Sequence, residues 1–163
     1  PSLLTFPHEP DHLLLGGDQG LFDSKDAGHH WKDLTTITGN IQMLTSSQTQ
    51  PMRIFCQTDQ GLFTWKEGNN APTLLTPPTP QLFSRLVSDS SGTTLYGLSG
   101  RTLWSSEDAG QHWQQRQQFD RGDLIALQID PQNPSRLYAG FFLPPKVILS
   151  QNSGKSWQVV TSS

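Results

Sequence analysis

The chain has 163 residues, with 11 lysines and arginines against 14 aspartates and glutamates, and a formal net charge of −3. Leucine, isoleucine, valine and phenylalanine make up about 24 % of it, above the roughly 20 % below which a chain is expected to be disordered. The mild acidity and the five scattered lysines exclude a protein that binds nucleic acid through positive charge. A membrane-spanning helix needs about 20 consecutive apolar residues, and no apolar run approaches this length, which excludes membrane insertion by such a helix.

Four groups of short apolar segments follow one another along the chain. In each group an alternating run precedes two apolar segments that are joined by a polar turn, a pattern typical of β-strands. The first runs are 3–6, 41–44, 85–87 and 124–129, the second 13–15, 54–55, 95–96 and 137–138, and the third 21–22, 62–63, 103–104 and 147–149. A fourth run closes the group, as in 31–34 and 157–160. No helical period persists beyond one turn, so each group predicts four strands.

An eight-residue segment follows the third strand in three of the four groups. Its pattern is Ser-x-Asp-x-Gly-x-x-Trp, and its copies are Ser24, Asp26, Gly28, Trp31; Ser106, Asp108, Gly110, Trp113; and Ser150, Asn152, Gly154, Trp157. Segment 64–71 keeps only the hydroxyl and the glycine, as a decayed copy. The copies start at residues 24, 64, 106 and 150, so the spacings are 40, 42 and 44 residues. Such a period is typical of propeller blades with four strands.

This pattern resembles the Asp-box, also called the bacterial neuraminidase repeat, of sialidases, sortilin ectodomains, photosystem II assembly factors and polysaccharide hydrolases. The resemblance covers essentially the whole chain. It implies an all-β fold, a β-propeller of four-stranded antiparallel blades, with four blades in this chain. We predict a single module with blades at about 1–36, 37–78, 79–118 and 119–163.

The residues of the repeated segment suit a tight turn. The Asp carboxylate and the hydroxyl can hydrogen-bond to the turn backbone, the Gly permits a positive φ, and the Trp can bury its ring between sheets. Carboxylates used in this way are not free for chemistry. We therefore assign a structural role to all twelve residues and expect the three tryptophans to be equivalently placed.

Binding residues are expected in the loops of a propeller. The turn after the second strand of the fourth group carries Phe141, Phe142 and Leu143, which form either an apolar contact patch or packing under the neighbouring blade. Two further candidates, Arg121 and Asp123, flank a glycine in a tripeptide that integrins can read. The last two, Asp18 and Asp59, could lie near one face with Asp120 and Asp123 and supply the two carboxylates of a glycosidase. They also occupy equivalent turns, which indicates repeated turn chemistry.

Enzymatic and metal chemistry find little support in the sequence. A sialidase needs a Tyr/Glu pair, but the two tyrosines lie in predicted strands and two of the three glutamates lie in the repeated segments. Neighbouring histidines at 29 and 30 would point to opposite faces of a strand and not converge on one ion. Cys56 is the only cysteine, which excludes an internal disulfide and predicts a small buried side chain. No metal and no cofactor are predicted.

The resulting prediction is a non-catalytic binding or scaffolding module whose loop face recognises a protein or a glycan. The alternative is a carbohydrate-active, glycoside hydrolase-like propeller or a fragment of one. Because each predicted blade is complete in itself, we expect the arc of blades to form a homodimer that completes a ring or to be part of a larger propeller. The location of the proteins that the pattern resembles, together with the many Gln, Ser and Thr residues, favours an extracytoplasmic location. The sequence does not identify the compartment.

Overall fold

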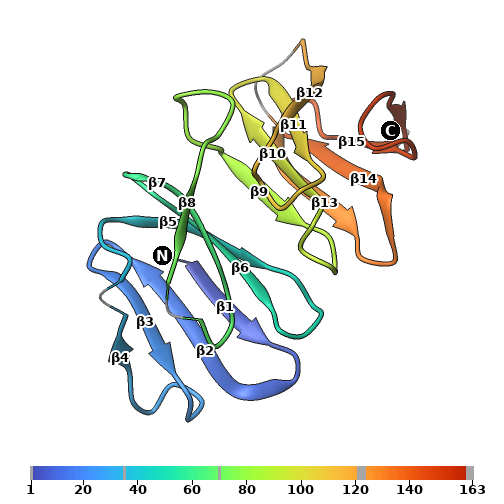
Figure 1. Cartoon of the computed structure of the whole chain (residues 1–163). Coiled ribbons are helices and arrows are strands. Elements are labelled where there is room, and N and C mark those ends of the chain that lie inside the picture. Colours follow the sequence, from blue (N-terminus) through green and yellow to red (C-terminus); the bar gives the residue numbers. More distant parts are fainter. Residues whose placement is uncertain (1, 35, 70, 121–123, 161–163) are drawn as a thin grey trace. The chain divides into compact units, whose positions relative to one another are not determined.

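The computed structural model describes residues 2–34, 36–69, 71–120 and 124–160. Every helix or strand among these residues is a β-strand, and the sixteen strands form four antiparallel sheets of four strands each (Figure 1). In each sheet, strands adjacent in sequence are paired, so every sheet is a meander. The prediction of an all-β fold with four-stranded propeller blades is confirmed.

The first two blades contain strands β1 to β8. Their bounds are β1 (Ser2–Phe6), β2 (Glu9–Gly17), β3 (Gly20–Ser24), β4 (Lys32–Asp33), β5 (Ile41–Ser46), β6 (Arg53–Thr58), β7 (Gly61–Lys66) and β8 (Thr73–Leu75). The last two blades contain β9 (Arg85–Ser88), β10 (Leu95–Ser99), β11 (Thr102–Ser106), β12 (Gln114–Gln118), β13 (Leu124–Asp130), β14 (Asn133–Phe141), β15 (Lys146–Ser150) and β16 (Gln158–Val159).

The blades belong to two compact units. The N-terminal unit, Pro1–Thr76, holds blades one and two, and the C-terminal unit, Pro77–Ser163, holds blades three and four. Each unit has its own hydrophobic core, in which residues of both of its blades pack together. The sequence-based division into one module of four blades stays a prediction.

Burial varies from strand to strand within a blade. Strand β10 is buried at all five positions and β6 at all but its first, because both of their faces are covered. The last strands β4 and β16 are exposed throughout and contain polar residues. Cys56 lies in β6 and is buried, as the sequence predicted, and this burial raises the pKa of its thiol to about 12.

The three intact repeated segments form one kind of turn, here called the box turn. In each, the Ser hydroxyl accepts a hydrogen bond from the Gly backbone N–H, at 2.9 Å from Gly28, 2.8 Å from Gly110 and 2.9 Å from Gly154. The same hydroxyl donates to the Asp or Asn side chain, whose oxygen accepts the backbone N–H four residues further on. The glycine and the residue before it both have positive φ in all three turns.

The tryptophans of the box turns are not equivalent. The indole N–H groups of Trp113 and Trp157 donate to the carbonyls of Gly110 and Gly154, at 3.0 and 3.2 Å. The Trp31 residue is 39 % exposed and Trp113 and Trp157 are half-buried, so the expectation of three buried, equivalent rings is wrong. Trp113 and Trp157 each contact a phenylalanine from the connection that precedes the first strand of their own blade, Phe83 and Phe119.

Blade two keeps the turn but not the box. In all four blades the residue before the turn glycine donates its backbone N–H to a carbonyl near the start of the second strand. In blade two this bond joins Glu67 to Met52 at 2.7 Å. The hydroxyl of Thr64 donates instead to the carbonyl of Ile54. Blade two therefore keeps the path of the chain with a different set of side-chain bonds.

Candidate binding site

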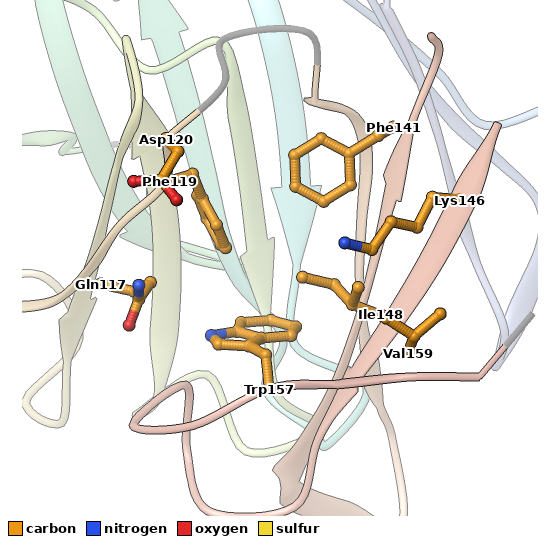
Figure 2. A pocket seen from close by; sticks show the side chains of 8 residues that line it. All are labelled: Gln117, Phe119, Asp120, Phe141, Lys146, Ile148, Trp157 and Val159. Carbon is orange, nitrogen blue, oxygen red and sulfur yellow. The ribbon is translucent and has the colours of Figure 1, made fainter. Parts of the chain in front are cut away.

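An aromatic pocket lies in the C-terminal unit, between blades three and four (Figure 2). Its accessible volume is about 190 Å³, enough for one side chain. Gln117 comes from β12 of blade three, and the two residues after this strand, Phe119 and Asp120, lie in the connection to blade four. The described residues that line it are Gln117, Phe119, Asp120, Phe141, Lys146, Ile148, Trp157 and Val159.

Three aromatic rings form one continuous wall of the pocket. The Phe119 ring meets Phe141 edge-on, with centroids 5.7 Å apart, and meets Trp157 in the same way at 5.6 Å. Phe119 and Phe141 are buried, and both belong to the core of the unit. Because the core holds these two rings and the box turn holds Trp157 through its N–H, the wall is formed before any ligand arrives.

Polar groups stand at two sides of this wall. Figure 2 shows Gln117 and Asp120 on one side and the Lys146 ammonium on the other. The Lys146 Nζ lies 6.0 Å from the centroid of the Phe141 ring, within the range of a cation–π contact. The backbone carbonyl of Asp120 accepts a hydrogen bond from Arg101 at 3.0 Å, which anchors this residue next to the pocket. The pocket thus offers an apolar interior with a carboxylate and an ammonium at its edge.

The structure separates the three residues of the predicted apolar patch. Phe141 is only 8 % exposed and packs in the core as the end of β14. The next two residues, Phe142 and Leu143, are 59 % and 62 % exposed on the turn that leads to β15. One ring therefore serves as pocket wall, and the two apolar side chains beside it in sequence face solvent.

The four charged candidates are not brought together. Asp18 is exposed in the turn between β2 and β3. Asp59 accepts the Asn40 backbone N–H at 3.2 Å, and its own N–H donates to the Asn40 carbonyl, so its carboxylate fastens two connections of the N-terminal unit. Arg121 and Asp123 lie outside the described residues. The described part of the chain therefore gives no evidence for a carboxylate pair built from these positions.

Sequence reasoning did not single out Phe119, Lys146 or Gln117 as pocket residues. The sequence did hold a signal for Phe119, because a phenylalanine, Phe83 or Phe119, precedes the first strand of blades three and four. In the structure both rings contact a box tryptophan. The aspartates of the box turns have lowered pKa values. The backbone N–H of His30, followed by its ring, lowers the pKa of Asp26 to about 2, and His112 does the same to Asp108.

No protein-family model matches the chain. A 69-residue stretch is 29 % identical to an uncharacterized membrane glycoprotein of Saccharomyces cerevisiae, over 42 % of this chain and 16 % of that protein. No helix in the described part of the chain is long and apolar enough to cross a membrane.

The fold is similar to that of known propellers. The GH74 xyloglucanase from Xanthomonas campestris superposes with a TM-score of 0.75 at 23 % identity, over 98 % of this chain and 29 % of that one. YCF48 bound to D1 peptide gives 0.68 at 18 % identity, over 93 % and 50 %, and YCF48 from Cyanidioschyzon merolae gives 0.69 at 12 %, over 99 % and 56 %. The chain thus spans between about a quarter and about half of the propellers it resembles, and the likeness establishes the fold alone.

Proposed function

We propose that this chain is a non-catalytic β-propeller module that binds an extended peptide segment at the aromatic pocket. The observation that carries the proposal is the pocket walled by Phe119, Phe141 and Trp157, together with the exposed side chains of Phe142 and Leu143, which follow Phe141 in the sequence. Such a surface can take one apolar side chain into the pocket and cover its neighbours on the turn. Asp120 and Lys146 would bond to the backbone or to charged groups of the peptide.

Glycan binding fits this surface less well. Aromatic rings do stack on sugars, but a glycan also needs several polar side chains directed at its hydroxyls. The pocket has polar side chains in Gln117, Asp120 and Lys146, but the exposed Phe142 and Leu143 add none. Proteins of similar fold include both a peptide-bound YCF48 and a xyloglucanase. The fold therefore does not distinguish peptide binding from glycan binding, and the side chains of the site are the basis for choosing between them.

The hydrolase alternative has one specific observation in its favour, the carboxylate of Asp120 at an aromatic pocket. Glycoside hydrolysis ordinarily needs two carboxyl groups that flank the scissile bond. Among the described lining residues Asp120 is the single carboxylate. We therefore rank binding above hydrolysis.

A peptide selection tests the proposal. Peptides selected from a displayed random library against the whole chain are measured by calorimetry against the Phe142→Ser/Leu143→Asn double variant. We expect binding to weaken by at least about tenfold while the melting temperature stays the same, because exposed side chains contribute little to folding. Leu74→Asn is the matched control, since Leu74 is 60 % exposed on β8 of the N-terminal unit.

Two results would contradict the proposal. In one, the double variant binds the selected peptides as well as the original chain does. In the other, the original chain releases reducing sugar from xyloglucan and Asp120→Asn abolishes this release, which would establish the hydrolase alternative.

Two broader expectations accompany this proposal. The resemblance of the box turns to Asp-boxes and the similarity to a yeast glycoprotein support an extracytoplasmic location.

A homodimer would bring a second copy of the pocket into one assembly. Light scattering should then give twice the 18.1 kDa of the chain, and a stable monomer would refute the dimer.

A further inference from the structure

A buried histidine in the N-terminal unit is surrounded by carboxylates. His12, on β2, is 7 % exposed. Its Nε2 lies 2.7 Å from an oxygen of Asp23 on β3, and its Nδ1 lies 3.0 Å from Glu9 and 3.7 Å from Glu67. His12, Asp23 and Glu9 belong to blade one, whereas Glu67 follows the last residue of β7 in blade two. The cluster therefore joins the two blades of this unit.

The ring nitrogens of His12 have different surroundings. When Nε2–H donates to Asp23, the lone pair of Nδ1 faces one oxygen of Glu9 and one of Glu67, so three donor atoms lie around one position. A proton on Nδ1 would serve Glu9 alone, because the Glu67 oxygen at 3.7 Å is too far for a hydrogen bond. The other oxygen of Glu67 is buried and has no hydrogen-bond partner. A proton on Nδ1 thus leaves the buried oxygen of Glu67 without a partner.

A metal ion satisfies all three groups. One donor atom each from Glu9, His12 and Glu67 can be chosen so that all lie within 4.8 Å of one another. A tetrahedral zinc ion with bonds of about 2.0–2.2 Å keeps its donors about 3.3–3.6 Å apart. The distances from Nδ1 to the two glutamates, 3.0 and 3.7 Å, lie on either side of this range.

The surroundings of the histidine are those of a metal ligand. A ligating histidine commonly donates its second ring N–H to a carboxylate, which fixes its tautomer, and Asp23 accepts this bond here. The Phe6 ring stacks on the imidazole at a centroid distance of 3.8 Å and an angle of 4°, so the ring cannot turn freely. A cavity of about 300 Å³ borders His12, Asp23 and Glu67, with room for a water molecule as fourth ligand.

We propose that Glu9, His12 and Glu67 bind a divalent transition-metal ion of the zinc type, with Asp23 as the group that orients His12. One nitrogen and two carboxylate oxygens form a donor set that zinc accepts, and an open fourth position is typical of zinc sites that bind water or a ligand. The ion would hold blade two against blade one. This site is independent of the aromatic pocket, which lies in the other unit.

Zinc titration of the whole chain, first stripped with a chelator, tests the proposal. We expect calorimetry to show one tightly bound Zn²⁺ per chain and a rise in melting temperature. Glu67→Gln keeps the shape of the side chain but removes the charge, and should weaken zinc binding by at least about tenfold. Glu107→Gln is the matched control, because Glu107 is an exposed glutamate of the C-terminal unit whose carboxylate contacts Arg116.

Two further measurements identify the ligands. Nitrogen NMR should show His12 with zinc on Nδ1 and the proton on Nε2. The double variant His30→Asn/His112→Asn removes the two exposed His–Asp pairs of the box turns and should leave the tight site intact. The proposal is overturned if Glu67→Gln binds zinc as tightly as the original chain, or if the double variant removes all binding.

Discussion

The two units use the same turn position for different purposes. In the C-terminal unit, the residue before the turn glycine is Ala109 in blade three and Ser153 in blade four, small residues with φ near 60°. In the N-terminal unit, blade one also has a small residue with positive φ at this position, Ala27, whereas blade two has Glu67, which keeps the same backbone hydrogen bond but is not among the described residues with positive φ. The comparison shows that, without the box pattern, this position no longer requires a positive φ, which favours small residues. A long charged side chain can therefore occupy it and reach His12.

The two units also differ in what covers their turns. Both box tryptophans of the C-terminal unit contact a phenylalanine and donate their N–H to a glycine carbonyl. In the N-terminal unit the Trp31 ring is exposed. Aromatic contacts therefore tie together the connections of the C-terminal unit, whereas ionic groups link the two blades of the N-terminal unit.

The strongest test of this difference replaces the turn glycines. Gly154 and Gly68 have nearly the same φ, 80° and 79°, so an alanine at either position is strained by about 1–2 kcal/mol. At Gly154 the new Cβ would also lie 2.9 Å from Leu103, which adds about 1–2 kcal/mol, while at Gly68 nothing lies within 4 Å. We expect Gly154→Ala to lower the free energy of unfolding by about 2–4 kcal/mol and Gly68→Ala by about half as much. Equal losses in denaturant unfolding would remove the proposed distinction between the two turns.

A second test compares two tryptophans. Trp157→Ala removes a half-buried ring, its contact with Phe119 and its hydrogen bond to Gly154. We expect a loss of about 2–3 kcal/mol, below the about 3–5 kcal/mol of a fully buried ring, and a loss under about 1 kcal/mol for Trp31→Ala. Thermal unfolding followed by circular dichroism measures both. A larger loss for Trp31 would show that its exposed ring stabilises the fold.

A third test concerns the charge of the box aspartate. The backbone N–H and the ring of His112 lower the pKa of Asp108 to about 2, so the ionised carboxylate stabilises the fold above about pH 4, and this stabilisation is lost as the pH falls through about 2. Asn152 makes the corresponding bonds with a neutral amide. We therefore expect Asp108→Asn to keep the melting temperature at pH 7 within a few degrees, and Asp108→Ala to lower it further.

NMR titration of the Asp108 carboxyl carbon provides the direct measurement. A midpoint near 4 in the folded chain would show that the box hydrogen bonds do not favour the charged form. If Asp108→Asn lowered the melting temperature as much as Asp108→Ala, the carboxylate charge and not its hydrogen-bond geometry would hold the turn.

The last prediction, with the smallest expected effect, concerns how fast the Cys56 thiol is labelled. It is the only cysteine of the chain and lies in the N-terminal unit, and burial raises the pKa of its thiol to about 12. A thiol reagent should label it only when this unit opens. Zn²⁺ should slow the labelling in the original chain and have little effect in Glu67→Gln. Fast labelling in the native state would contradict the observed burial.

Local sequence determined the strands, the turns and the blade architecture. The spacing of apolar segments and the repeated Ser-x-Asp-x-Gly-x-x-Trp pattern predict these features because strand alternation and turn chemistry act over a few residues. The bonds of Ser106, Asp108 and Gly110 follow from their spacing alone, since all three lie in one turn. Burial of Cys56 was predictable for the same reason, from its place in an apolar strand.

Only the tertiary structure decided which side chains meet across blades. Glu9 and Glu67 are 58 residues apart and share no motif, yet both face Nδ1 of His12, because the packing of two sheets brings the ends of their strands together. Likewise, Phe141 and Phe142 are neighbours in sequence, but alternation along the end of β14 and the neighbouring Phe119 turn one inward and leave the other in solvent. Such contacts depend on how one blade packs on the next, which no local pattern encodes.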